Sequence, residues 1–126
     1  MTAPRPYRIL ITGSRDWADH DMVRDALTMA IYQNTPATII HGACPSGADA
    51  MASWWIRRYQ FLGLTEERHP ANWQQYGKAA GPRRNTHMVN LGADVCLAFI
   101  RNSSRGASHT AALAEAAGIP TRRFTA

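Results

Sequence analysis

Three short and almost uninterrupted apolar runs constrain the fold of this chain more than any other feature. They are Tyr7–Thr12 (YRILIT), Thr38–His41 (TIIH) and Ala93–Ile100 (ADVCLAFI). Apolar runs of this length that lack polar alternation are typical of strands covered on both faces, as in a parallel sheet. Parallel neighbours need crossover connections, so we expect helices between the strands.

The segments between these runs carry helical spacing and helix boundary residues. Four helices are predicted: one capped by Asp19 or Asp21 and ended by Asn34–Pro36, one from Ala48 to about Tyr59, one with Pro82 in its first turn ending near Gly92, and one over Thr110–Ala117. Leu64–His69 is a more polar strand expected at or near a sheet edge, and Ile119–Phe124 is a last strand. Pro70–Gly77 is expected to be an irregular aromatic loop. The order predicts an α/β fold with a three-layer, mostly parallel sheet of about five strands and right-handed crossovers.

The 126 residues suit one domain over residues 7–126. Residues 1–6 hold two prolines and no periodicity, so a short disordered leader is expected there. No apolar run is long enough to span a membrane, and no apolar signal segment stands near the N-terminus, which favours a cytoplasmic protein. Cys44, Cys96 and the five histidines lack metal-ligand spacing, so we expect neither a metal nor another cofactor.

The net charge is +5, and thirteen of the fourteen basic residues are arginine. Arginine favours forked contacts with phosphate or carboxylate groups. Four loops follow the carboxyl ends of predicted strands: Gly13–Trp17, Gly42–Asp49, Pro70–Asn85 and Arg101–His109. Ligands of open α/β sheets bind at this edge. The loop Gly42–Gly47 leads from a strand into a helix, an order that phosphate-binding sites use.

The loops also carry a family resemblance. Ile11–Trp17 (ITGSRDW), His41–Asp49 (HGACPSGAD), Ala79–Asn85 (AAGPRRN) and Ala98–Phe99 are similar to successive signatures of the YspA/YpsA-related branch of the SLOG superfamily. The resemblance covers nearly the whole chain, from about Tyr7 to Phe124. It implies a Rossmann-like fold shared with the LONELY GUY phosphoribohydrolases and with the nucleotide-fold domain of the DNA-processing protein DprA. It also implies a nucleotide or nucleotide-derived ligand.

The ligand-binding residues expected from the loops and the resemblance are Gly13, Ser14, Arg15, Gly42, Ala43, Ser46, Gly47, Asp49, Arg84, Asn85, Arg105, Gly106 and Ser108. The phosphate is expected at Gly42–Gly47 and at Gly106–Ser108. Asp49 is either a helix cap or an acceptor for a ribose hydroxyl, and the sequence leaves both roles open. The first hypothesis is therefore a nucleotide-binding protein that acts as a sensor or carrier.

The second hypothesis is an N-glycosidase of the LONELY GUY type with Arg84 in a catalytic role. Those enzymes use an Arg-Lys pair and a P-G-G-x-G-T-x-x-E loop. Here Asn85 stands in place of the lysine, and within Ser103–Thr110 the threonine becomes Ala107 and the glutamate becomes Thr110. Such an enzyme would need a displaced acid, for which Asp49 and Glu115 are the candidates.

A third hypothesis is binding to single-stranded nucleic acid, with Trp17, Trp73 and Tyr76 as stacking residues. We also expect a homodimer or higher homo-oligomer. Trp54, Trp55 and Tyr59 give one helix more aromatic surface than a small domain readily covers.

Overall fold

The computed structural model describes residues 5–126, which form one five-stranded sheet with helices on both faces. The elements are β1 (Tyr7–Gly13), α1 (His20–Ile31), β2 (Ala37–His41), α2 (Gly47–Tyr59), η1 (Gln60–Leu62), β3 (Leu64–Arg68), α3 (Trp73–Tyr76), η2 (Gly77–Ala79), α4 (Ala80–Leu91), β4 (Val95–Ile100), α5 (Arg105–Ala116) and β5 (Thr121–Thr125). The strand order is β3-β2-β1-β4-β5, and every pairing is parallel. The predicted α/β, Rossmann-like fold is confirmed.

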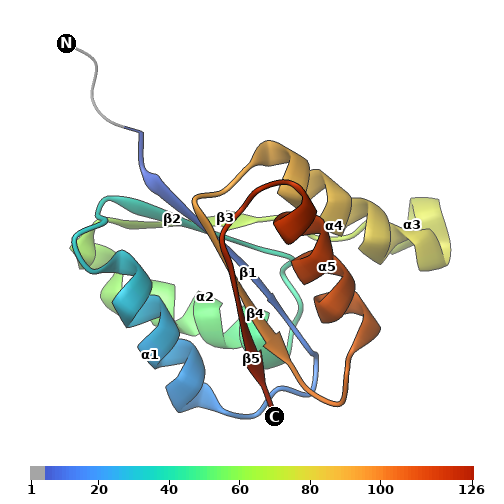
Figure 1. Ribbon diagram of the computed structural model, residues 1–126, viewed down its shortest axis with the longest axis horizontal. Helices are drawn as coiled ribbons and strands as arrows, with labels where there is room; N and C mark the ends of the chain where they lie inside the picture. The colour runs from blue at the N-terminus through green and yellow to red at the C-terminus, as the bar shows by residue number, and fades with distance from the viewer. Residues whose placement is uncertain (1–4) are drawn as a thin grey trace.

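The helices form two layers, with α1 and α2 on one face of the sheet and α4 and α5 on the other (Figure 1). Alternate strand residues supply the two cores, because successive side chains of a strand point to opposite faces. Ile9 and Ile11 lie in the core under α1 and α2, whereas Leu10 and Ile40 lie with Met88 in the core under α4. This double burial explains why the three central strands β1, β2 and β4 have almost no polar alternation.

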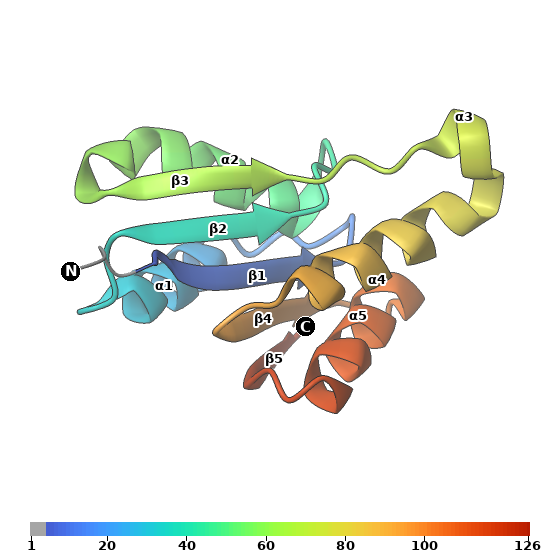
Figure 2. The same ribbon diagram turned by 90° about the horizontal axis from the view of Figure 1, so that it is seen from above.

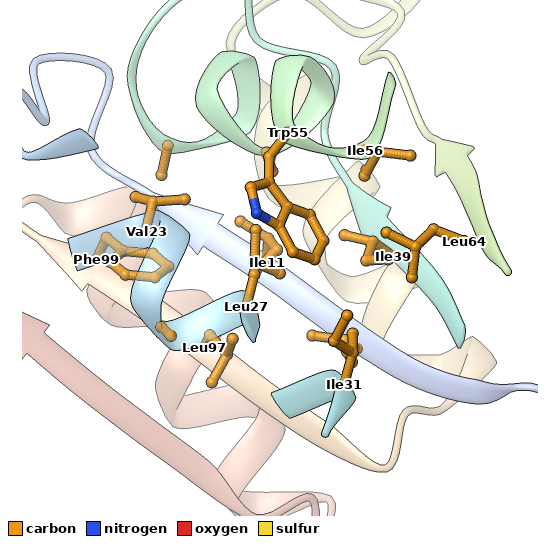
Figure 3. Close-up of a cluster of buried hydrophobic side chains, with 14 of the residues drawn as sticks. Ile11, Val23, Leu27, Ile31, Ile39, Trp55, Ile56, Leu64, Leu97 and Phe99 are labelled. Atoms are coloured by element: carbon orange, nitrogen blue, oxygen red, sulfur yellow. The ribbon is translucent and has the colours of Figure 1, made fainter. Parts of the chain in front are cut away.

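Trp55 fills the centre of the larger core, between α2 and the sheet (Figure 3). It is 4% exposed, while its neighbour Trp54 is 66% exposed. Burial of a large apolar side chain contributes roughly 1.5–3 kcal/mol. Trp55 therefore belongs to the core, and of the expected interface aromatics only Trp54 projects fully into solvent.

Two local predictions were wrong. The helix expected at Thr110 begins at Arg105, so Arg105–Ser108 is the first turn of α5 and not a loop. The first turn is helical because Ala107 packs against Ala98 and Ile100 of the sheet. The loop expected at Pro70–Gly77 contains the short helix α3, whose first turn is capped by the side chain of Asn72.

β3 lies at one edge of the sheet, as its polar sequence predicted. Residues 1–4 of the expected leader lie outside the described residues. Arg5, which was also expected to belong to the leader, forms an ion pair with Asp94 at 2.8 Å. Among residues 5–126, no helix combines the length and the hydropathy that crossing a membrane requires.

Candidate functional site

A cavity of about 560 Å³ opens at the carboxyl edge of the sheet. All strands point toward this edge, and α3 projects beyond it (Figure 2). After β1 the chain forms β2 and β3 on one side of β1, and it then crosses to form β4 and β5 on the other side. The strand order therefore reverses its direction between β1 and β4. The cavity lies where loops after these strands separate, which is the usual ligand position in open α/β sheets.

The structure brings most of the expected residues together. Gly13, Arg15, Gly42, Asp49, Arg84, Asn85, Arg105 and Gly106 line the cavity. Ala43 and Ser46 line a neighbouring hollow that shares Gly42 and Arg84 with it. Ser14, Gly47 and Ser108 do not line either space.

Arg84 fixes one wall of the cavity. Its Nη1 donates to the carbonyl oxygen of Gly42 at 2.5 Å and to that of His69 at 3.2 Å, and its Nε donates to Oδ1 of Asn85 at 2.7 Å. A Cβ added at Gly42 would lie 2.5 Å from Nη1 of Arg84. A side chain at position 42 would therefore have to displace the guanidinium from this wall.

Asp49 lies in the first turn of α2 and is 6% exposed. Its Oδ2 accepts a hydrogen bond from the backbone N–H of Cys44 at 3.3 Å. Its Oδ1 is buried and has no hydrogen-bond partner within the described chain. Burial raises the pKa of Asp49, against the smaller opposing effects of His41, Cys44 and Arg84.

The start of α5 forms the opposite wall, with Ser104 to Ala107 lining the cavity. No acidic residue lies in its first turn, and Ser104 makes no side-chain capping bond. A Cβ added at Gly106 would meet nothing within 4 Å. The first turn of this helix therefore lacks a side-chain cap and borders open space at Gly106, and the dipole of a helix favours an anion at its start.

The wall charges are mainly positive. Arg15, Arg84 and Arg105 line the cavity, and none of them forms an ion pair within residues 5–126. The acids in the lining are Asp49 and Asp16, and Asp16 lies 4.0 Å from Nε of Arg101. This balance suits a ligand with negative charge.

Three expected residues have a structural role in place of a position in the cavity lining. Oγ of Ser14 accepts from the backbone N–H of Arg101 at 2.8 Å and joins the ends of β1 and β4. Gly47 has φ +69°, and a Cβ there would lie 2.3 Å from the carbonyl oxygen of Ser14. Ser108 lies within the first turn of α5, where its N–H donates to the carbonyl oxygen of Ser104.

Two candidates named for the alternative functions lie away from the cavity. Trp17 is 3% exposed and packs edge-on against Phe99, with ring centroids 5.5 Å apart, so its expected stacking role was wrong. Glu115 is exposed and pairs with Arg123 at 2.6 Å, outside the cavity lining. Of the two displaced acids considered, only Asp49 lies at the site.

His41 and Cys44 both follow β2 near the cavity. His41 is 1% exposed; its Nδ1 accepts from the N–H of Ala43 at 3.0 Å, and its Nε2 lies 2.6 Å from Oε2 of Glu66. It therefore holds the loop after β2 in place. Burial, followed by the charge of Asp49, raises the pKa of the Cys44 thiol, which disfavours a nucleophilic thiolate.

Several lining residues were missing from the expected ligand-binding set: Thr12, Asp16, Ser104 and His109, and also Trp73, which was expected only as a stacking residue for single-stranded nucleic acid. Trp73 is the most prominent, since it is 48% exposed and the guanidinium of Arg15 lies 5.6 Å from its ring centroid. In the sequence, the only sign that Trp73 could contact a ligand was its position in an expected loop, next to polar residues. Within residues 5–126, no three His, Cys, Asp or Glu side chains gather as metal ligands.

Comparison with known proteins identifies the family. The family described as "YspA, cpYpsA-related SLOG family" matches residues 7–76, which include the loops after β1 and β2. The chain is also 41% identical over 119 residues to the "Gene 61 protein" of Mycobacterium phage D29, covering 93% of this chain and 95% of that protein. No solved structure matches the chain significantly. The chain thus belongs to the YspA, cpYpsA-related SLOG family.

Proposed function

We propose that the protein binds a nucleotide or nucleotide-derived ligand in the cavity at the carboxyl edge of the sheet and acts as a sensor or carrier. Family membership supports a nucleotide-related ligand. The observation that carries the proposal is the unpartnered Oδ1 of Asp49, buried in the wall of a cavity that three arginines also line. Such a site offers an acceptor for a hydroxyl group beside donors for an anion.

Asp49 supplies the acceptor. A buried polar atom without a partner costs about 1–3 kcal/mol, so it is rarely retained without a use. A ribose hydroxyl can donate to Oδ1 while Oδ2 keeps its bond from Cys44. Since the carboxylate already lies at the start of α2, a phosphate at the same helix start would be repelled.

The start of α5 supplies the anion site. Its free N–H groups, the side chain of Arg105 and the open space at Gly106 suit a phosphate. Trp73 lines another part of the cavity and presents an exposed ring on which a base can stack. The ligand therefore places its phosphate at α5, its ribose at Asp49 and its base toward Trp73.

One observation favours the alternative of a nucleotide N-glycosidase. Burial raises the pKa of Asp49, and a carboxyl group with a raised pKa can serve as a general acid or base. In this alternative, Thr110 stands where the LONELY GUY enzymes have their glutamate, and Asp49 takes over the role of that glutamate. Arg84 then binds the substrate. Asp49 then acts on the leaving base instead of only holding the ribose.

The experiment is a panel of nucleoside monophosphates followed by thermal shift and by release of free base. The binder predicts stabilisation by at least one nucleotide without base release, with affinity reduced about tenfold in Arg105→Ala. Arg122→Ala is the control, because Arg122 stacks over Phe124 on β5 and does not line the cavity. Absence of binding by every nucleotide contradicts the proposal.

The same panel separates the two functions. Base release that disappears in Asp49→Asn while the nucleotide still binds would establish the N-glycosidase. Base release at the same rate in the wild type and in Asp49→Asn would exclude Asp49 as the acid. The release would then come from a contaminating enzyme or from another acidic residue.

A further inference from the structure

Two further hollows continue from the cavity around the loop that follows β2. The first has a volume of about 630 Å³ and shares Arg15, Trp73 and Arg84 with the cavity. The second has a volume of about 300 Å³ and lies between α2 and the end of β3. Ala43, Cys44 and Pro45 line both hollows, so the two hollows adjoin the same three-residue loop.

The hollow between α2 and β3 has the chemistry of a phosphate site with an aromatic neighbour. Arg57 of α2 and Arg68 at the end of β3 line it, and neither forms an ion pair within the described residues. No acidic residue is part of its lining. Trp54 also lines it and is 66% exposed, which leaves the ring free for stacking.

The nearby carboxylate of Glu66 is already engaged. Burial opposes ionisation, but hydrogen bonds from Ser53 and His41 lower the pKa of Glu66, so it remains charged and paired. His41 in turn accepts the N–H of Ala43, whose φ is +59°. The wall between the hollows is thus held by buried hydrogen bonds and keeps its shape without a ligand.

We propose that the ligand is two or more linked nucleotides, with its first phosphate in the cavity and a second phosphate at Arg57 and Arg68. This inference rests on the proposed function and specifies the class of its ligand. Ala43–Pro45 is only three residues long and lines both hollows, so a ligand that leaves the cavity around this loop enters the second hollow directly. Trp73 and Trp54, one on each side of the loop, then stack successive bases.

Arg58 provides a matched control for the second site. It follows Arg57 in the last turn of α2, and both arginines complement the carboxyl end of that helix. Arg58 lies over the ring of Tyr59, with its Cζ 5.4 Å from the ring centroid, and does not line the hollow. Arg57→Ala and Arg58→Ala therefore remove the same charge from the end of the helix, but only Arg57→Ala also removes a ligand contact.

The test compares 5′-phosphorylated dinucleotides with the corresponding mononucleotides by calorimetry: pApA, pCpC, pGpG and pUpU against AMP, CMP, GMP and UMP. We expect the preferred dinucleotide to bind at least tenfold more tightly than its mononucleotide and with a steeper salt dependence. Arg57→Ala with Arg68→Ala should remove this difference and leave the mononucleotide affinity unchanged. Arg58→Ala should keep the difference.

Each other outcome is decisive. Equal affinities for dinucleotide and mononucleotide overturn the second site and leave the proposed function intact, provided that mononucleotide binding still depends on Arg105. A difference that survives in the double variant also overturns it, because the second phosphate then binds elsewhere. Failure of all eight compounds to bind overturns both the second site and the proposed function.

Discussion

The starts of α2 and α5 both follow a strand at the carboxyl edge of the sheet, and both contain glycine, yet they are built differently. At α2, the space beside Gly47 is taken by the carbonyl oxygen of Ser14, and Asp49 supplies a negative charge. At α5, the space beside Gly106 is open, and no acidic residue lies in the first turn. One helix start is filled by the protein itself, and the other is accessible to a ligand.

This difference shows what can be concluded from a glycine in the sequence of such a loop. A glycine in such a loop indicates that a side chain is excluded, because of φ or because of a close neighbour. It does not indicate whether that neighbour is the protein or a ligand. Gly47 is required by its φ and by the backbone of the loop after β1, and Gly42 leaves room for the guanidinium of Arg84, whereas a Cβ at Gly106 meets no atom within 4 Å.

The largest effect should come from Gly47→Ala. Its φ of +69° strains any side chain, and the new Cβ would lie 2.3 Å from the carbonyl oxygen of Ser14. Left-handed strain of roughly 1–2 kcal/mol and overpacking of roughly 1–3 kcal/mol together predict a loss of about 3 kcal/mol in the free energy of unfolding. Urea denaturation measures it.

Gly118→Ala is the control for this prediction. Gly118 has φ +81° but no atom within 4 Å of the added Cβ, so only the strain of about 1 kcal/mol remains. Equal losses in the two variants would mean that the start of α2 is no more tightly filled than an exposed helix end, and the comparison would fail.

Gly106→Val should have the next largest effect, and on binding instead of folding. The side chain enters open space at the start of α5, so the free energy of unfolding changes by less than about 1 kcal/mol. If a phosphate lies there, nucleotide affinity falls at least tenfold, about 1.4 kcal/mol. Ala112→Val, at an exposed position of α5 outside the cavity, is the control for helix propensity and should bind normally. Normal binding by Gly106→Val would exclude a phosphate at α5.

The fold was predictable because a strand that is buried on both faces of the sheet has a continuous run of apolar residues in the sequence. Ile9 and Leu10 face different cores, so neither can be polar, and the run reads as a central strand. The start of α5 was not predictable, because Ser, Arg and Gly residues are typical of loops. The helical turn is stabilised by the packing of Ala107 against Ala98 of β4, which these residue types alone do not reveal.

The site was predictable in its position and only partly in its residues. The topology alone brings the loops after β1, β2 and β4 to one edge. The sequence cannot distinguish Trp17, which Phe99 buries, from Trp73, which lines the cavity, since both follow strands in polar loops. That distinction depends on a contact between residues far apart in the chain.

Asp49→Asn should have a smaller effect on stability, and in the unusual direction of a gain. Burial raises the pKa of Asp49 above its ordinary value of 3.8, so the folded protein holds a proton more tightly than the unfolded chain. Stability therefore falls as the pH rises from the ordinary carboxyl range through the raised value, and the penalty is complete above it. The variant should remove this fall and gain about 1 kcal/mol in free energy of unfolding at neutral pH, measured by denaturation across a pH series.

Asp94→Asn is the control with the opposite sign. Partial burial acts against the charge, but hydrogen bonds from Arg8 and Arg5 lower the pKa of Asp94, so its contribution is lost as the pH falls. That variant should lose stability at neutral pH. A loss in Asp49→Asn as well would mean that the carboxylate stabilises the start of α2, and its unpartnered oxygen would no longer indicate a ligand.

The smallest effect concerns the thiol of Cys44, which reports the charge at the start of α2. Burial and the charge of Asp49 raise its pKa, against the smaller lowering effects of Arg84 and Arg15, and Asp49→Asn removes the contribution of Asp49. The pKa of Cys44 should therefore fall, and iodoacetamide should modify it about twofold faster at pH 8. Cys96 is an internal control, because burial raises its pKa to about 12 and keeps it unreactive. An unchanged rate would mean that Asp49 is protonated at pH 8 in the wild type. The start of α2 would then carry no fixed charge, and the phosphate would have no electrostatic reason to prefer α5.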